Sequence, residues 1–355
     1  MKKLNSLQVI RALACVGVIT GHSGMTKLGA WGVSVFLVLS GFLMSYVYDD
    51  RKLESSFVSN IKFSVKKIKK LYLLHILMLI NFLAAFVINH DKFLNDTVSC
   101  FWTTIANAAL IQAWVPIYSV YFSLNHASWY LSACLFLYFL FPYILSYLRK
   151  LSDSKKVFFS ACIIYGIMLS TEIFCIIVFS DKDVFHPSYW FTYIFPIFRA
   201  GDFYIGCCIG YVFRHHKIHL KAVSATLLEI ITFVLIFIAE TMIKEKLYPL
   251  GTTTLFLPTS VLLVYLFALN TGWISRILTC KPLVLIGDIS GHMFLIHMIV
   301  IRYFFVEHVP LPLNQWTMTF SFIVVTVIAS VFYIKAEKYI VQKLEKHKQR
   351  KQEQP

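Results

Sequence analysis

Two ionisable residues, Arg11 and His22, interrupt the first apolar stretch of the chain. Their separation on an α-helix corresponds to roughly 16 Å of rise and about 20° of rotation, so both lie on one helix face. An ionisable group inside a membrane segment is costly and marks a functional site by default. Imidazole suits general-base chemistry at neutral pH, and a fixed cation can stabilise negative charge. The alternative is that each side chain snorkels or pairs structurally.

The composition of the whole chain identifies the class of protein that must position these residues. Of 355 residues, 58% are hydrophobic and only 14% are charged, and the mean hydropathy is +0.69. A soluble domain carries about 25% charged residues. Disordered chains are poor in aromatic and aliphatic residues, whereas 16% of this chain is aromatic. The composition therefore predicts an all-α, polytopic membrane protein.

Ten apolar runs are long enough to cross a bilayer. They are predicted near residues 6–23, 29–48, 71–89, 129–148, 157–180, 190–213, 223–243, 249–269, 287–306 and 315–335. The segment 93–116 is moderately apolar but carries polar residues, and we interpret it as interfacial or re-entrant. We expect one membrane domain over residues 1–340, followed by a basic cytoplasmic tail over residues 341–355.

The distribution of basic residues predicts the orientation of these spans. With the N-terminus inside, the inside segments hold 25 of the 33 Lys and Arg residues and the outside loops hold 5. Cytoplasmic loops of membrane proteins collect Lys and Arg, so both termini are predicted to be cytoplasmic. The same asymmetry accounts for most of the net charge of +15, and no nucleic-acid partner is needed to explain it.

Four further motifs follow Arg11 and His22 along the chain. Residues 29–42 read GAWGVSVFLVLSGF, residues 129–131 read WYL, residues 198–206 read FRAGDFYIG, and residues 287–297 read GDISGHMFLIH. With the R-x10-H spacing at the start, these segments resemble the acyltransferase 3 family of integral membrane acyltransferases, in the family's order. The resemblance covers most of the chain, except the tail and residues 214–286.

Members of this family move an acyl group, usually acetyl, from a cytoplasmic coenzyme A thioester to an acceptor. The resemblance implies an O-acyltransferase in the bacterial plasma membrane that uses acyl-CoA as co-substrate. Its acceptor would be a hydroxyl of a cell-surface polysaccharide or its lipid-linked precursor. The resemblance makes His22 the catalytic residue, which activates the acceptor hydroxyl or transiently carries the acyl group. Arg11 would support it by contacting the pantetheine or thioester region.

The remaining motif positions have alternative interpretations. The basic run contains Lys66, Lys67, Lys69 and Lys70. These lysines would attract the phosphates of the donor, or they only orient the protein. Arg199 and Asp202, three residues apart on a helix, would pair and hold spans together. His297 would line the cavity or bond between helices. Trp129, at a span end, is expected to anchor the membrane interface.

Small residues along the second span predict close helix packing. Gly29, Gly32 and Gly41, with Ser34 and Ser40, would let this span approach the first and hold the face that carries Arg11 and His22.

The chain departs from the family pattern at several positions. Leu37 replaces a usual Phe, and Cys134 stands where a glutamate is common. A lysine run replaces an arginine-rich stretch, so phosphate contacts would lack the bidentate fork of Arg. His292 and Phe294 replace tyrosines before the late histidine.

Other classes of site and function were weighed against this interpretation. Six of the eight cysteines lie in apolar runs, and we predict neither a disulfide framework nor a metal site. A transporter or flippase of a lipid-linked saccharide would also suit ten spans, although no internal repeat is visible. A non-catalytic partner in glycan assembly is a third possibility, which predicts that His22→Ala is harmless.

Overall fold

The computed structural model describes residues 4–88, 97–179, 183–216, 218–247, 251–306 and 314–352. Within these ranges the chain is helical and contains no strand. The α-helices are α1 (Asn5–His22), α2 (Gly29–Tyr48), α3 (Phe57–Ile88), α4 (Thr97–Ala108), α5 (Tyr118–Tyr121), α6 (Trp129–Leu151), α7 (Ser154–Val178), α8 (Pro187–Tyr189), α9 (Pro196–His215), α10 (Ala222–Met242), α11 (Thr252–Leu269), α12 (Trp273–Leu278), α13 (Lys281–Val306) and α14 (Gln315–Gln352). The 3-10 and π turns are η2 (Gln112–Trp114), η3 (His126–Ser128), η4 (Trp190–Ile194) and η5 (Ile243–Leu247).

Each predicted span falls on a helix, and the all-α class is confirmed. Among the described residues, seven helices are long and apolar enough to cross a membrane: α2, α6 with η3, α7, α10, α11, α13 and α14. The other three predicted spans fall on α1, the second half of α3, and η4 with α9. Because these helices carry charged or polar residues, the count of ten stays a prediction. Positions 89, 180, 249 and 250 of the predicted spans lie outside the described residues.

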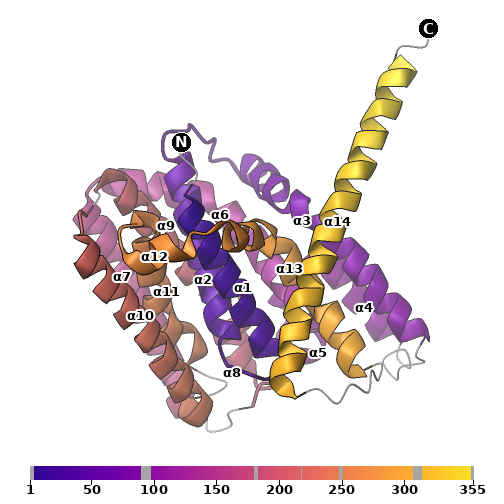
Figure 1. Ribbon diagram of the computed structural model, residues 1–355, viewed down its shortest axis with the longest axis horizontal. Helices are drawn as coiled ribbons and strands as arrows, with labels where there is room; N and C mark the ends of the chain where they lie inside the picture. The colour runs from indigo at the N-terminus through magenta and orange to yellow at the C-terminus, as the bar shows by residue number, and fades with distance from the viewer. Residues whose placement is uncertain are drawn as a thin grey trace.

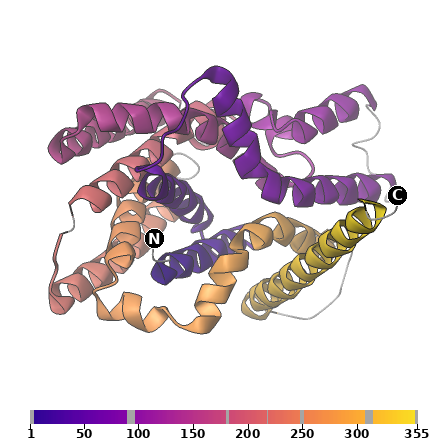
Figure 2. The same ribbon diagram turned by 90° about the horizontal axis from the view of Figure 1, so that it is seen from above.

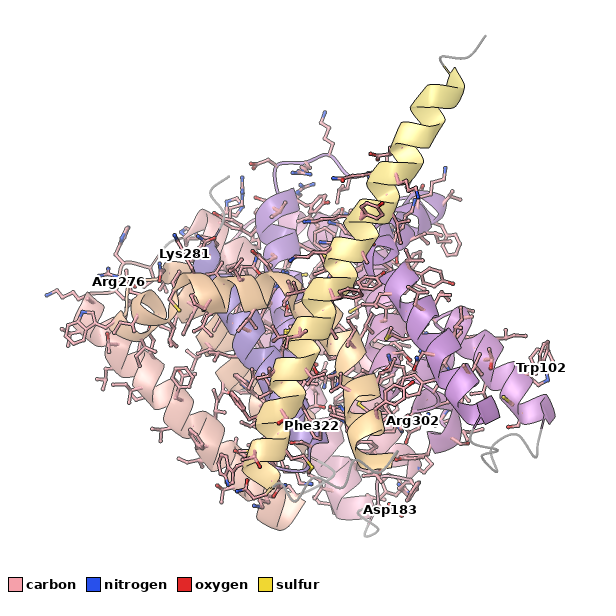
Figure 3. The ribbon with its side chains drawn as sticks, turned by 45° about the vertical axis from the view of Figure 1, so that its right-hand side comes forward. Trp102, Asp183, Arg276, Lys281, Arg302 and Phe322 are labelled. Carbon is pink, nitrogen blue, oxygen red and sulfur yellow. The ribbon has the colours of Figure 1, made fainter. Side chains whose placement is uncertain are left out.

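Two segments predicted outside the spans are also helical. Of the segment 93–116, residues 97–108 form α4 and residues 112–114 form η2, while residues 93–96 lie outside the described part of the chain. Trp102 on α4 is 63% exposed and lies at the edge of the molecule (Figure 3). The predicted basic tail continues α14 as far as Gln352, and its last three residues are not among those described.

The first two helices lie at the centre of the bundle. α1 packs against α2 and α13, while the other side of α2 packs against α9 and α11 (Figures 1 and 2). α14 packs against α13, crosses the front of the bundle in Figure 1 and lies at its edge in Figure 2. The central position of α1 explains why its apolar residues are almost all buried, among them Val9, Ile10 and Ile19.

Glycines bring the central helices into backbone contact. A Cβ at Gly32 would meet the carbonyl oxygen of Ala14 on α1, and one at Gly29 would lie 3.6 Å from the Cα of Gly21. These two contacts confirm the predicted packing of the second span on the first. The same prediction is wrong for Gly41, because a Cβ there would meet the carbonyl oxygen of Phe203 on α9. The small residues of α2 therefore serve two neighbours.

We expect Gly206→Ala to destabilise the fold, because the added methyl would meet the backbone of Val38. Overpacking a close contact costs about 1–3 kcal/mol. Gly166→Ala on α7 is the matched control, since nothing lies within 4 Å of its Cβ. Thermal unfolding in detergent should show a lower midpoint for Gly206→Ala alone. Equal midpoints for the two variants would contradict this account of the α2–α9 contact.

Candidate active site

Arg11 lies in a cavity of about 160 Å³ between α1, α2, α3, α6 and α13. Apolar side chains, including Phe36, Leu71 and Phe294, form much of its lining. Arg11 is partly exposed, and its Nη1 donates to Oε1 of Gln8 at 3.4 Å. The guanidinium is thus held on one side by a long hydrogen bond, and it also interacts electrostatically with Tyr138, Tyr130 and Asp288. It remains available to a ligand in the cavity, which we call the Arg11 cavity.

Polar groups from two other helices line the same cavity. Tyr130 and Tyr138 of α6 and Ser40 of α2 face Arg11 across it. Both tyrosines interact through their side chains with Ser40 and with Cys134. Cys134, which replaces the family's glutamate, is therefore part of this buried polar cluster. The hydroxyls of Tyr130, Tyr138 and Ser40 could orient a polar molecule beside the Arg11 guanidinium.

His22, the last residue of α1, lies in a second cavity of about 140 Å³. This cavity, the His22 pocket, is lined by the α1–α2 connection and by Tyr189, Tyr193 and Thr252. His22 is exposed within it. An imidazole in a pocket lined by tyrosine and threonine residues provides a base and hydroxyl groups for a hydroxyl-bearing acceptor.

His297 of α13 lies between the two cavities. Its ring centroid is 5.1 Å from that of His22 and 5.9 Å from that of Phe294, which lines the Arg11 cavity. The His297 side chain is fully buried. Arg11 and His22 are therefore placed on one helix, each in its own cavity, with two rings of α13 between them.

The loop before α6 supports this arrangement. Nδ2 of Asn125 donates to the backbone oxygen of Leu295 at 3.0 Å, which ties the loop to α13. His126, the next residue, interacts electrostatically with His22 and with Arg302. Arg302 also lies over the ring of Phe82 at 5.3 Å, and Figure 3 labels it on α13. Neither Asn125 nor His126 belongs to a predicted motif, so sequence analysis missed them.

Arg199 and Asp202 are paired and completely buried. Their Nη2 and Oδ1 atoms are 3.4 Å apart, and both side chains have 0% exposure. Ser34 Oγ of α2 donates to Asp202 Oδ1 at 2.8 Å, and Arg199 Nη1 donates to Thr253 Oγ1 of α11 at 2.7 Å. The predicted pairing is therefore present, and it links three helices; a purely structural role stays a prediction. Arg199 also lies 5.7 Å from the ring of Tyr193, which lines the His22 pocket.

Glu172 of α7 extends this network. Thr254 N donates to Glu172 Oε2 at 2.9 Å, and Thr253 N donates to Oε1 at 3.3 Å. The Glu172 carboxylate thus accepts hydrogen bonds from amide groups of the first turn of α11 and interacts favourably with the dipole of that helix. The adjacent Thr252 lines the His22 pocket, so this network fixes one of its walls.

The prediction that Trp129 anchors the membrane interface is wrong. Its side chain is 4% exposed and packs on Tyr193, at 5.3 Å between ring centroids. It also lies 6.3 Å from the ring of Tyr130. Tyr193 belongs to the His22 pocket and Tyr130 to the Arg11 cavity. Trp129 is therefore an interior wall between the two, which its position at a helix end did not reveal.

The four predicted donor lysines do not share one environment. Lys66, Lys69 and Lys70 are exposed, whereas Lys67 is partly buried. The Lys67 ammonium lies 4.4 Å from the ring centroid of Tyr48. Lys70 interacts electrostatically with His292 and precedes Leu71, which lines the Arg11 cavity.

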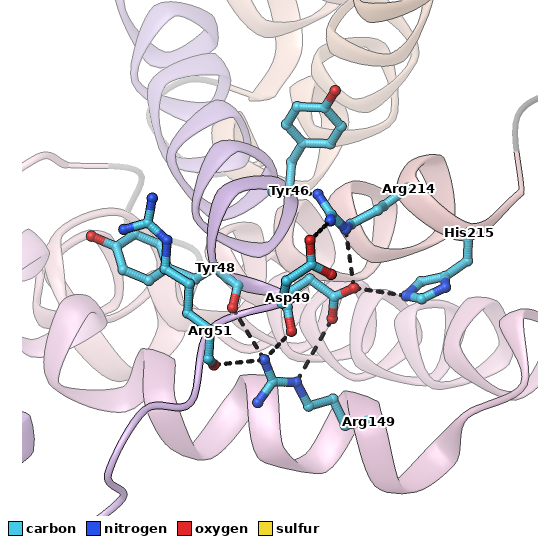
Figure 4. Close-up of polar contacts among 8 residues, drawn as sticks. Tyr46, Tyr48, Asp49, Arg51, Arg149, Arg214 and His215 are labelled. Atoms are coloured by element: carbon cyan, nitrogen blue, oxygen red, sulfur yellow. Dashed lines mark hydrogen bonds and ion pairs between the residues drawn. The ribbon is translucent and has the colours of Figure 1, made fainter. Parts of the chain in front are cut away.

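An ion-pair cluster around Asp49 joins the ends of α2, α6 and α9 (Figure 4). Asp49 pairs with Arg149 at 3.7 Å, with Arg214 at 3.2 Å and with His215 at 2.9 Å. Arg149 also donates to the carbonyls that end α2, including that of Tyr48 at 3.1 Å. The basic run 214–219 thus contributes Arg214 and His215 to this cluster, and its Lys217 lies outside the described residues.

Comparisons with known proteins agree with the geometry. A protein-family model described as an acyltransferase domain matches residues 4–335. The Acyltransferase MdmB of Streptomyces mycarofaciens is 24% identical over 286 residues, which cover 79% of this chain and 70% of that protein. No solved structure shows significant similarity. The region matched by the family model contains both cavities and every predicted site residue.

Proposed function

Because this chain belongs to the acyltransferase 3 family of membrane acyltransferases, we propose that it acylates a glycan hydroxyl. It transfers an acyl group, in our proposal acetyl, from cytoplasmic acyl-CoA to a cell-surface polysaccharide or its lipid-linked precursor. The observation that carries the proposal is the placement of Arg11 and His22 in two cavities along one helix. The family match favours this chemistry over transport of a lipid-linked saccharide.

The two cavities suit the two substrates of such a transfer. The Arg11 cavity has a cation and hydroxyls among apolar walls, which suits the thin pantetheine arm and the thioester of the donor. The His22 pocket has an imidazole and hydroxyl-bearing side chains in its lining, which suits a sugar. The donor thioester would reach past Phe294 and His297 towards His22.

The reaction itself requires one proton acceptor and one charge stabiliser. His22 accepts the proton of the acceptor hydroxyl while its oxygen attacks the thioester carbonyl carbon. The tetrahedral oxyanion then collapses, the carbon–sulfur bond breaks, and the leaving coenzyme A thiolate takes the proton that His22 accepted. Arg11 binds the pantetheine arm of the donor in its own cavity. Because roughly 16 Å of helix rise separates Arg11 from His22, the oxyanion must be stabilised by a group nearer His22.

The proposed membrane orientation has both termini in the cytoplasm and ten spans. The Asp49 cluster supports it, because it brings together three segments that the basic-residue distribution places inside, 49–70, 149–156 and 214–222. α1 begins and α14 ends on the same side of the molecule (Figure 1). Arg276 and Lys281, predicted inside, lie far from Asp183, predicted outside (Figure 3). A bacterial plasma membrane is the proposed location.

The donor role is tested with Arg11→Gln. We expect KM for acyl-CoA to rise about 10- to 100-fold, because a charge-assisted hydrogen bond contributes about 1.5–3 kcal/mol. Arg11→Lys is the matched control, because it keeps the charge but not the planar guanidinium. Its KM should lie between those of wild type and Arg11→Gln. Initial rates with purified protein and labelled acyl-CoA give the KM of each variant. Wild-type KM in Arg11→Gln would remove Arg11 from donor binding.

Two lysines are proposed to hold the donor phosphates at the same cavity. Lys67 and Lys70 lie about 40° and 100° around α3 from Leu71, which lines the cavity, whereas Lys66 and Lys69 lie about 140° and 160° from it. Lysine binds phosphate as a point charge. The proposed donor site therefore narrows from four lysines to these two, and Lys66 and Lys69 need another explanation.

A further inference from the structure

The first half of α3 has three distinct faces. Asn60, Ser64 and Ile68 form the buried face, with exposures of 0%, 2% and 5%. Phe57, Val58, Ile61 and Val65 form an apolar face and are 64%, 59%, 42% and 53% exposed. The exposed residues Lys62, Lys66 and Lys69 form the third face. At 100° per residue, the lysines lie directly beside the apolar face.

An apolar groove of about 320 Å³ runs along the exposed apolar face. Phe57, Ile61 and Val65 of α3 form one wall. Ile111 and Trp114, from the segment around η2, and Phe139 of α6 contribute to the rest. The hydroxyls in the groove are used internally, since Ser132 Oγ donates to Leu110 O at 2.6 Å. The groove therefore offers a ligand apolar contact, and the lysine face lies beside it on α3.

The lysine face is turned away from the proposed donor site. Lys62, Lys66 and Lys69 lie roughly 140–180° around the helix axis from Leu71, which lines the Arg11 cavity. A donor in that cavity would meet Lys67 and Lys70 before these three residues. Their neighbours are instead the exposed apolar side chains, which in a membrane protein contact lipid.

We propose that this part of α3 binds an anionic phospholipid. One acyl chain lies in the groove, and the phosphate headgroup contacts Lys62, Lys66 and Lys69. The positive charge of the three lysines favours an anionic lipid over a neutral one, because a basic face beside an apolar face attracts anionic lipid at a membrane surface. The inference does not depend on acyl transfer, so it can fail or succeed independently of the proposed function.

Native mass spectrometry of the full chain in detergent tests the site. The probes are palmitoyl-oleoyl phosphatidylglycerol and the phosphatidylcholine with the same chains. We expect wild type to bind the anionic lipid about tenfold more tightly. The triple variant K62Q/K66Q/K69Q should lose this preference while keeping wild-type affinity for acyl-CoA. K67Q/K70Q should keep the lipid preference and lose acyl-CoA affinity.

Two controls separate a site from general charge. K155Q/K156Q/K221Q removes the same charge from exposed lysines elsewhere and should keep the preference. Ile111→Trp fills the groove but keeps all the lysines, and it should lower the affinity for the anionic lipid severalfold. The proposal is overturned if K62Q/K66Q/K69Q still prefers phosphatidylglycerol, or if the control triple loses the preference equally. It is also overturned if K62Q/K66Q/K69Q loses acyl-CoA affinity instead, because the lysines then serve the donor.

Discussion

Replacing His22 by alanine is expected to lower kcat for acyl transfer by about 10²- to 10⁴-fold, the usual contribution of a positioned general base. His22 lines its pocket, whereas its neighbour His297 is fully buried and occupies a different position. The measurement is the transfer of labelled acyl groups from acyl-CoA into the glycan fraction of membranes that carry each variant.

The affinity of His22→Ala for acyl-CoA should distinguish a loss of catalysis from a loss of the folded structure. Arg11 and the donor cavity lie apart from His22, so His22→Ala should bind acyl-CoA as wild type does. His219→Ala, at an exposed position after α9, is the matched histidine control and should retain full kcat. Transfer by His22→Ala at the wild-type rate would show that the imidazole is not the base.

Replacing Arg199 by methionine is expected to destabilise the protein by about 3–5 kcal/mol, because it leaves the carboxylate of Asp202 buried without its partner. The variant also loses the hydrogen bond to Thr253, which links α9 to α11. Unfolding by denaturant in detergent, followed by tryptophan fluorescence, measures the change in free energy.

The double variant Arg199→Met/Asp202→Leu distinguishes a buried pair from a binding role. Removing both charges should recover much of the lost stability, since an apolar pair avoids the desolvation cost. If Arg199→Met is as stable as wild type but loses transfer activity, the pair acts on substrate instead of holding helices together.

Local sequence pattern predicted the elements that carry the candidate site. The helix that bears Arg11 and His22 begins and ends within one residue of the predicted span, because apolar periodicity and length define a membrane helix. Their common face follows from the helical repeat. The predicted pairing of Arg199 with Asp202 required only a spacing of three residues on one helix.

Contacts between distant segments were not predictable from spacing. Gly41 and Gly32 are both small residues of α2 and looked alike in the sequence, yet the structure places Gly41 against α9 instead of α1. Trp129 occupies a helix end, where an interfacial anchor is the usual role, but the loop before it carries it into the interior. The lysine run appeared uniform, but the buried face of α3 and the position of Leu71 in the Arg11 cavity place Lys67 nearer that cavity than Lys66 and Lys69.

The central claim is that this chain acylates a surface glycan through His22. The most direct test compares that glycan from a deletion strain complemented with wild type or with His22→Ala at matched membrane levels. Proton NMR before and after mild base detects ester-linked acyl groups. The account predicts base-labile acyl signals with wild type and none with His22→Ala. The same acyl content in both glycans would contradict it.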